Sequence, residues 1–162
     1  MVSKINKEED MRISEIEKKF SSEETLNEVL DECKEDFEKI DYLSGLMKDS
    51  ITDNPIEAKK ALNELTGVYM SLKIVLAEAE TQKKNRELKY YTNIKMETQN
   101  SGKKFVSAST EKEASSSVAN YRRIRNIIEA YVESALRGIS TLQSVLKYCG
   151  EELKLSGGNN QQ

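Results

Sequence analysis

Apolar residues recur at alternating three- and four-residue steps over two long stretches of the chain. In the first stretch these positions are Leu62, Leu65, Tyr69, Leu72, Leu76 and Ala79. A 3.5-residue repeat is typical of a coiled-coil seam. Pro55 follows Asp53 and Asn54 and suits a first helical turn, because its fixed φ and missing N–H are tolerated there. The pattern predicts a long helix that begins at Pro55.

The second apolar stretch predicts another long helix. Its stripe consists of Ile124, Ile128, Val132, Ala135, Ile139, Leu142, Leu146, Cys149 and Leu153. We expect this helix to begin near Thr110, where Glu113 completes a capping-box pattern. Residues 98–110 lack periodicity and contain Ser, Gly and Asn, which predicts a loop with a short extended piece at Phe105 and Val106. A loop between two long helices predicts an antiparallel helical hairpin.

The N-terminal region also has helical spacing. Ser22, with two acids after it, suits a helix start, and apolar residues follow at Leu26, Val29, Leu30, Cys33, Phe37, Ile40, Leu43 and Met47. Earlier anchors are sparse (Ile5, Ile13 and Ile16). We therefore predict an all-α fold with an acidic helical region over residues 1–54, a coiled-coil-like hairpin over 55–155, and a disordered tail over 156–162.

Charge is distributed unevenly along the chain. Residues 1–60 contain 10 Lys and Arg against 17 Asp and Glu, whereas residues 61–162 contain 15 against 11. Eleven basic residues and four acids lie between residues 83 and 125. The basic residues are Lys83, Lys84, Arg86, Lys89, Lys95, Lys103, Lys104, Lys112, Arg122, Arg123 and Arg125. In a hairpin they would gather at one end, which we call the basic end.

Four aromatic residues accompany the basic end: Tyr90, Tyr91, Phe105 and Tyr121. Basic side chains displace phosphate counterions and aromatic rings stack on unpaired bases, so this composition favours a single-stranded nucleic-acid surface. Tyr121 is expected in the core, because it precedes Ile124 and Ile128 at core spacing. Tyr91 and Phe105 are the better stacking candidates. The alternative interpretation is a solvated helix end whose tyrosines pack in the core.

The arginines at residues 122–125 allow two interpretations. Arg122 and Arg125 lie three residues apart on one helix face, with Arg123 rotated away. The pair would suit adjacent phosphates, or it would bind acids of the N-terminal helix. The acidic stretch over residues 31–41 would suit a metal, but a solvated helix face explains it more simply.

Composition excludes several kinds of catalytic site. The chain has no histidine and no phosphate-cradling glycine motif, which removes histidine-based triads, zinc sites of the usual kind and nucleotide-driven chemistry. We therefore expect no enzyme activity and no cofactor. Cys33 and Cys149 form no CxxC motif and are expected as reduced thiols. No signal peptide or membrane-spanning run is visible, which predicts a soluble cytoplasmic protein without a membrane partner.

The order of these features resembles the phage UvsY recombination-mediator family over about residues 60–154. The resemblance rests on the run QKKNRELKYYTN, the stretch TEKEASSSVANYRRIRN and the final helix ALRGISTLQSVLKYC. It implies a helical, non-catalytic protein in the host cytoplasm that forms ring-like homo-oligomers and binds single-stranded DNA. Such a protein helps to load a RecA-class recombinase onto strands coated by single-strand-binding protein.

On this interpretation, the nucleic-acid-binding residues are Lys83, Lys84, Arg86, Lys89, Tyr91, Lys103, Lys104, Phe105, Arg122, Arg123 and Arg125. The last helix would make the oligomer through Ile128, Val132, Ala135, Ile139, Leu142 and Leu146. The long acidic N-terminal region and the longer loop depart from the family pattern. The alternative is a structural or adaptor coiled coil, such as a virion component or a chaperone-like protein, whose basic end binds an acidic protein partner.

Overall fold

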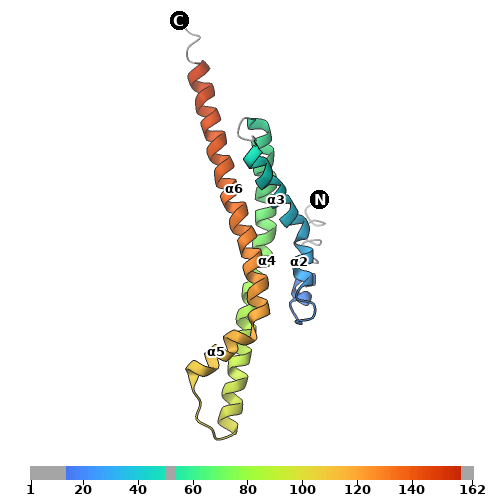
Figure 1. Ribbon diagram of the computed structural model, residues 1–162, viewed down its shortest axis with the longest axis vertical. Helices are drawn as coiled ribbons and strands as arrows, with labels where there is room; N and C mark the ends of the chain where they lie inside the picture. Colours follow the sequence, from blue (N-terminus) through green and yellow to red (C-terminus); the bar gives the residue numbers. More distant parts are fainter. Residues whose placement is uncertain (1–13, 50–53, 158–162) are drawn as a thin grey trace. The chain divides into compact units, whose positions relative to one another are not determined.

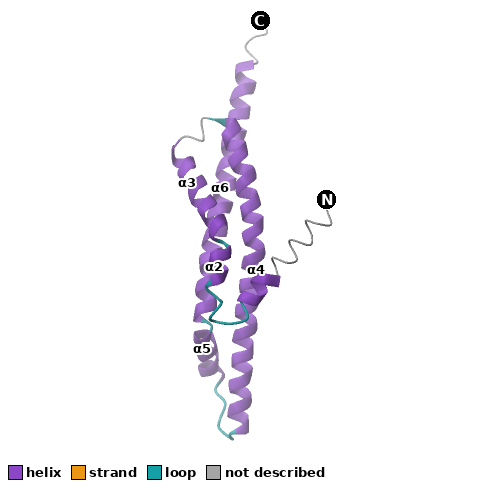
Figure 2. Ribbon diagram, turned by 90° about the vertical axis from the view of Figure 1, so that its right-hand side faces the viewer, coloured by secondary structure: helices purple, strands orange, loops and turns teal. Residues whose placement is uncertain are grey.

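The computed structural model describes residues 14–49 and 54–157, and the regular elements in these residues are all α-helices (Figures 1 and 2). Residues 14–19 are helical and are followed by α2 (Glu28–Glu32), α3 (Lys34–Asp49), α4 (Pro55–Asn100), α5 (Ser107–Ser117) and α6 (Ala119–Gly157). The predicted all-α class is confirmed. None of the described helices combines the length and the apolar character that crossing a membrane requires.

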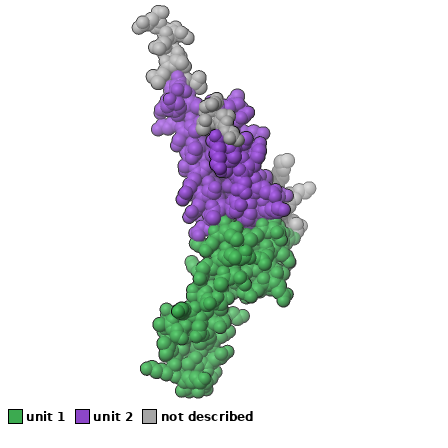
Figure 3. Space-filling view, in the orientation of Figure 1, with its two compact units in different colours: residues 1–32, 74–128 green, residues 33–73, 129–162 purple. Residues whose placement is uncertain are grey.

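The chain packs as two compact units, which are coloured separately in Figure 3. Unit 1 consists of Met1–Glu32 and Ile74–Ile128, and unit 2 consists of Cys33–Lys73 and Glu129–Gln162. The helices α4 and α6 each contribute residues to both units. The predicted boundary after residue 54 coincides with the start of α4, and each unit takes residues from both sides of it. Residues 158–162 of the predicted tail lie outside the described residues.

Pro55 is the first residue of α4, as the sequence predicts. Asn54 supplies the cap, since its Oδ1 accepts hydrogen bonds from the backbone N–H groups of Ile56 (3.1 Å) and Glu57 (3.3 Å). These bonds satisfy two of the donors that every helix leaves unpaired at its start.

The buried stripe of α4 includes four of the six predicted seam residues, Leu65, Leu72, Leu76 and Ala79, and differs at the other two. Leu62 and Tyr69 are only half-buried. The buried residues of α4 are Ala58, Ala61, Leu65, Val68, Leu72, Val75, Leu76 and Ala79. The buried residues keep the 3.5-residue repeat, but the buried face of the helix is shifted toward positions with smaller side chains, such as Ala61 and Val68. Alanine leaves room for close helix packing, and a pattern that counts only large apolar residues assigns such positions to the wrong face.

The end of α4 is set by Gly102. The helix continues to Asn100, beyond the predicted loop start at residue 98. Gly102 then has a φ of +66°, a left-handed conformation that glycine adopts without steric cost. Its N–H donates to the Gln99 carbonyl (3.1 Å) and the Lys103 N–H donates to the Thr98 carbonyl (3.2 Å). This pair of bonds is a Schellman motif, which closes the helix.

The second long helix is interrupted. The chain resumes helical structure at Ser107 rather than at Thr110, and Val118 separates α5 from α6 with φ of −102° and ψ of 21°. The predicted extended piece is confirmed at Val106, whose φ is −121° and ψ is 103°. It forms no strand. Val118 is buried, so the break directs an apolar side chain into the core of unit 1.

The N-terminal segment begins its helix later than predicted. Residues 21–27 form turns instead of a helix from Ser22, and we call residues 20–27 the N-terminal turn. The Ser22 hydroxyl accepts a hydrogen bond from the N–H of Glu24 (3.1 Å), and the Thr25 hydroxyl donates to the Lys19 carbonyl (2.8 Å). These local bonds compete with helix formation. Phe20 and Leu26 are buried and anchor the turn in unit 1.

The predicted oligomerisation stripe of α6 is largely covered by the chain itself. Ile128 is buried in unit 1, and Val132, Ala135 and Leu142 are buried in unit 2. Ile139 and Leu146 are half-buried. In unit 2 the Tyr131 ring of α6 stacks on Phe37 of α3, with ring centroids 3.9 Å apart and planes inclined by 16°.

Candidate nucleic-acid interface

Arg86 of α4 holds the N-terminal turn in unit 1. Its Nη2 donates to the Phe20 carbonyl (3.0 Å) and to the Ser21 carbonyl. The guanidinium carbon lies 4.6 Å from the centroid of the Tyr121 ring. The Tyr121 hydroxyl also donates to the Phe20 carbonyl, over 3.2 Å. A residue predicted to bind nucleic acid therefore already has a structural role.

Tyr121 is buried, with 1% of its surface exposed, which confirms the core position predicted for it. Burial raises the pKa of its hydroxyl above the usual 10.0, and the positive charge of Arg86 opposes this shift. Glu23 in the N-terminal turn raises the pKa further. The three groups thus lie close enough to influence one another.

The other predicted arginines also bind within unit 1. Arg122 donates to the Ser115 carbonyl of α5 (2.6 Å), and Arg125 pairs with Glu80 of α4 (3.0 Å). Arg123 donates to the amide oxygen of Asn27. Arg125 therefore pairs with an acid of α4, and Arg123, which was expected to point away from the other two arginines, contacts the N-terminal segment.

The two predicted stacking residues contact each other. The rings of Tyr91 and Phe105 meet edge to face, with centroids 5.9 Å apart and planes at 88°. The Tyr91 hydroxyl lies 3.0 Å from Ser107 Oγ at the start of α5, and Ser107 Oγ donates to Glu111 (2.9 Å). Both rings are half-buried. They stabilise the return of the chain from α4 to α5, and each leaves part of its surface accessible.

Lysines make up most of the exposed cations of the basic end. Lys84, Lys89, Lys103 and Lys104 are all exposed. Lys83 is half-buried and pairs with Glu87 at 3.7 Å, one turn further along α4. Exposed ammonium groups are free to exchange counterions for phosphates, whereas a guanidinium nitrogen already bound to a carbonyl is not available to a phosphate unless that bond breaks. The lysines therefore define the accessible part of the predicted site.

A pocket of about 310 Å³ lies in unit 1 beside Arg86. We call it the Arg86 pocket. Its lining includes Arg86, Lys89, Tyr90 and Asn93 of α4, together with Tyr121 and Glu23. The four α4 residues share a face, because steps of three, four and seven residues return to the same side of a helix. Tyr90 and Asn93 were not among the predicted binding residues, although their helical spacing from Arg86 is visible in the sequence.

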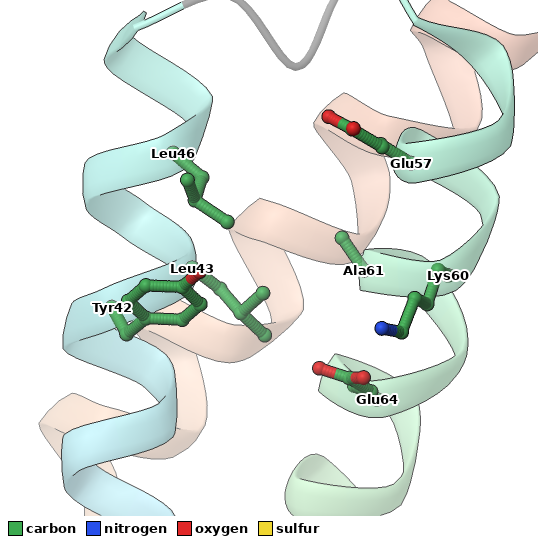
Figure 4. A pocket seen from close by; sticks show the side chains of 7 residues that line it. All are labelled: Tyr42, Leu43, Leu46, Glu57, Lys60, Ala61 and Glu64. Atoms are coloured by element: carbon green, nitrogen blue, oxygen red, sulfur yellow. The ribbon is translucent and has the colours of Figure 1, made fainter.

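A second pocket of about 340 Å³ lies in unit 2 (Figure 4). Tyr42, Leu43 and Leu46 of α3 line one side, and Glu57, Lys60, Ala61 and Glu64 of α4 line the other. The two carboxylates outnumber the single ammonium group. This charge balance disfavours a polyanion, so of these two pockets the Arg86 pocket is the better candidate for nucleic acid.

The acidic stretch over residues 31–41 contributes to packing in unit 2. Asp36 accepts a hydrogen bond from the Ser71 hydroxyl (2.8 Å), and Asp41 accepts one from the Tyr131 hydroxyl (3.3 Å). Across residues 14–49 and 54–157, no group of three or more Cys, Asp or Glu side chains is arranged to hold a metal ion.

Comparison of the chain with protein-family models, with curated proteins and with solved structures finds no match.

Proposed function

We propose that the protein binds single-stranded DNA through unit 1 and helps to load a RecA-class recombinase onto strands coated by single-strand-binding protein. The observation that carries the binding proposal is the set of exposed lysines in unit 1: Lys84, Lys89, Lys95, Lys103, Lys104 and Lys112. The loading role rests on the resemblance described above. The proposed mechanism is non-enzymatic, since it needs only a strand held on a basic surface and presented to another protein.

Aromatic rings support a preference for single strands. Tyr90 is 42% exposed, and Tyr91 and Phe105 are half-buried beside the exposed lysines of the loop. Unpaired bases offer faces for such rings, whereas the bases of a duplex are already stacked on one another. Binding to single strands should therefore exceed binding to duplex of the same length.

We also propose that α4 and α6 form an antiparallel hairpin with coiled-coil-like packing. Two contacts in unit 1 support this arrangement: Glu80 pairs with Arg125, and Arg86 lies against Tyr121. The residue number in α6 falls from 125 to 121 as the residue number in α4 rises from 80 to 86, which is the order that antiparallel helices require. The alternating three- and four-residue spacing of the buried α4 residues supports the coiled-coil character.

Self-association is a further part of the proposal. Because most of the predicted α6 stripe is buried within the chain, a partner would meet its accessible members, Ile139 and Leu146, and the neighbouring Leu136, which is 48% exposed. Leu136→Lys should then lower the mass measured by light scattering. Leu142→Asp is unsuitable for this test, because Leu142 is fully buried and a charge there would unfold the chain. A wild-type mass for Leu136→Lys would contradict an interface on this face.

The binding proposal is tested by fluorescence anisotropy of a labelled single-stranded oligonucleotide and a matched duplex at several salt concentrations. We expect tighter binding to the single strand and a steep fall in affinity with salt. Recombinase filament formation on DNA coated with single-strand-binding protein then tests the loading role. Equal affinity for both DNA forms, or no binding at low salt, would favour the adaptor alternative, in which the basic surface of unit 1 binds an acidic protein.

A further inference from the structure

Arg86 lines the Arg86 pocket and carries a buried hydrogen-bond donor without a partner in the described part of the chain. Its hydrogen-bond acceptors, the carbonyls of Phe20 and Ser21, are neutral, and so is the Tyr121 ring below it. Its buried Nε has no hydrogen-bond partner in the described part of the chain. Neutral acceptors fix the orientation of a guanidinium without cancelling its charge. Arg86 therefore brings a cation held by neutral groups to the wall of the pocket.

The rest of the pocket has the chemistry of a nucleotide site. Lys89 provides a second cation one turn along the same face of α4, Tyr90 provides an accessible ring, and Asn93 provides an amide that can donate and accept hydrogen bonds. A volume of about 310 Å³ is at the lower end of the ~300–1,000 Å³ found for small-ligand pockets. This volume is enough for one nucleotide of a DNA strand.

We propose that the Arg86 pocket binds a single nucleotide of the DNA strand. The phosphate would lie between the Arg86 guanidinium and the Lys89 ammonium, and the base would stack on Tyr90 with Asn93 at its edge. This inference rests on the proposed function and deepens it, because it assigns one fixed nucleotide position on a surface whose other lysines contact phosphates without fixed geometry.

Substitution of Glu23 should strengthen DNA binding, whereas the other substitutions in the pocket should weaken it. This exposed carboxylate of the N-terminal turn also lines the pocket. A negative charge at this position opposes the entry of phosphate, so Glu23→Gln should strengthen binding by about twofold at low salt. Weaker binding by Lys89 or Tyr90 variants could result from damage to the fold. Stronger binding by Glu23→Gln could not.

The experiment measures the affinity of a 3′-labelled tetrathymidylate with a 5′-phosphate, by anisotropy, for the full chain and its variants. Lys89→Ala should weaken binding roughly tenfold, the effect of losing one charge-assisted hydrogen bond. Lys84→Ala is the matched control, because it removes the same charge from an exposed position on the same helix that does not line the pocket. It should weaken binding by about twofold only.

Two further measurements complete the test. Tyr90→Ala should weaken binding roughly tenfold and Tyr90→Phe should not, because only the first removes the stacking surface. The NMR signal of the Arg86 Nε–H should shift when the oligonucleotide binds. Titration with inorganic phosphate alone separates a free-anion site from a nucleotide site: we expect weak competition that Tyr90→Ala leaves unchanged.

The outcomes distinguish this inference from the proposed function. Equal losses for Lys84→Ala and Lys89→Ala, or an Arg86 Nε–H signal that does not move, would overturn the pocket while single-strand binding remained. Competition by inorganic phosphate as strong as that by the oligonucleotide would overturn the nucleotide assignment. A wild-type chain that binds no single strand would overturn the proposed function itself.

Discussion

Gly138 of α6 lies where unit 2 has no space for a larger side chain. A Cβ added there would lie 2.6 Å from Leu65 Cδ2 and 3.1 Å from Met47 Cε. Leu65 is 1% exposed, so its side chain has little room to move. The two effects of Gly138→Ala are opposed: alanine stabilises a helix interior by about 1 kcal/mol, while overpacking a core costs about 1–3 kcal/mol. We expect a net loss of about 0–2 kcal/mol in the free energy of unfolding.

Gly67 of α4 is the matched control. It is exposed, and a Cβ added there would meet nothing within 4 Å. Gly67→Ala should therefore raise the free energy of unfolding by about 1 kcal/mol. The two variants should differ by about 1–3 kcal/mol, which corresponds to roughly 1 M in the urea midpoint.

Urea unfolding followed by circular dichroism at equal protein concentration measures both midpoints. A Gly138→Ala midpoint equal to or above that of Gly67→Ala would refute the close contact with Leu65. The double variant Leu65→Ala with Gly138→Ala provides a further check, because removing the leucine side chain removes the clash. In that background Gly138→Ala should be less destabilising than in the wild type, and an unchanged cost would assign the effect to another neighbour.

Two other predictions concern stability. Tyr121→Phe should lower the free energy of unfolding by about 0.5–1 kcal/mol at neutral pH, because the Phe20 carbonyl keeps its hydrogen bond from Arg86. The pKa of Tyr121 is raised in the folded state, so above its ordinary value of 10.0 the unfolded chain loses the proton first and stability falls as pH rises. Tyr121→Phe should make this fall less steep in urea titrations from neutral to alkaline pH, and an unchanged slope would contradict the burial of the hydroxyl. Asn54→Ala should cost about 0.5–2 kcal/mol through loss of the α4 cap, and Asn54→Asp should retain most of the stability. Equal urea midpoints for the wild type and Asn54→Ala would show that the cap does not contribute.

The starts and stops of helices differ in how clearly the sequence marks them. Asn54 before Pro55 is a strong start signal, and α4 begins there. The stop is less obvious, because residues 98–100 look like loop and become helix when Gly102 closes the turn beyond them. Val118 carries no sequence signal for a break. Its interruption of the helix follows from packing in unit 1, which a local pattern does not contain.

The candidate site was predicted in composition but not in detail. Clustering of charge predicted that the lysines and arginines of residues 83–125 belong together, and these residues lie in unit 1. The sequence could not show that Arg86 and Arg123 would bind the N-terminal segment, because those contacts join residues far apart in the chain. Tyr90 and Asn93 are close to Arg86 in the sequence, and their helical spacing places them on the same face. The sequence does not show that this face lines a pocket, so they were not predicted as binding residues.

Unit 1 is built from two segments that are separated in the sequence by part of unit 2, and this has a consequence for folding kinetics. The Phe20 carbonyl receives hydrogen bonds from residues 66 and 101 positions later, and the segment Cys33–Lys73 between them belongs to unit 2. Contacts of such high sequence separation require closure of a long loop before they contribute any stability. During synthesis, Phe20 leaves the ribosome about a hundred residues ahead of its Tyr121 partner. We therefore expect the N-terminal turn to dock late in folding, and its amides to exchange with solvent before those of the α4 core.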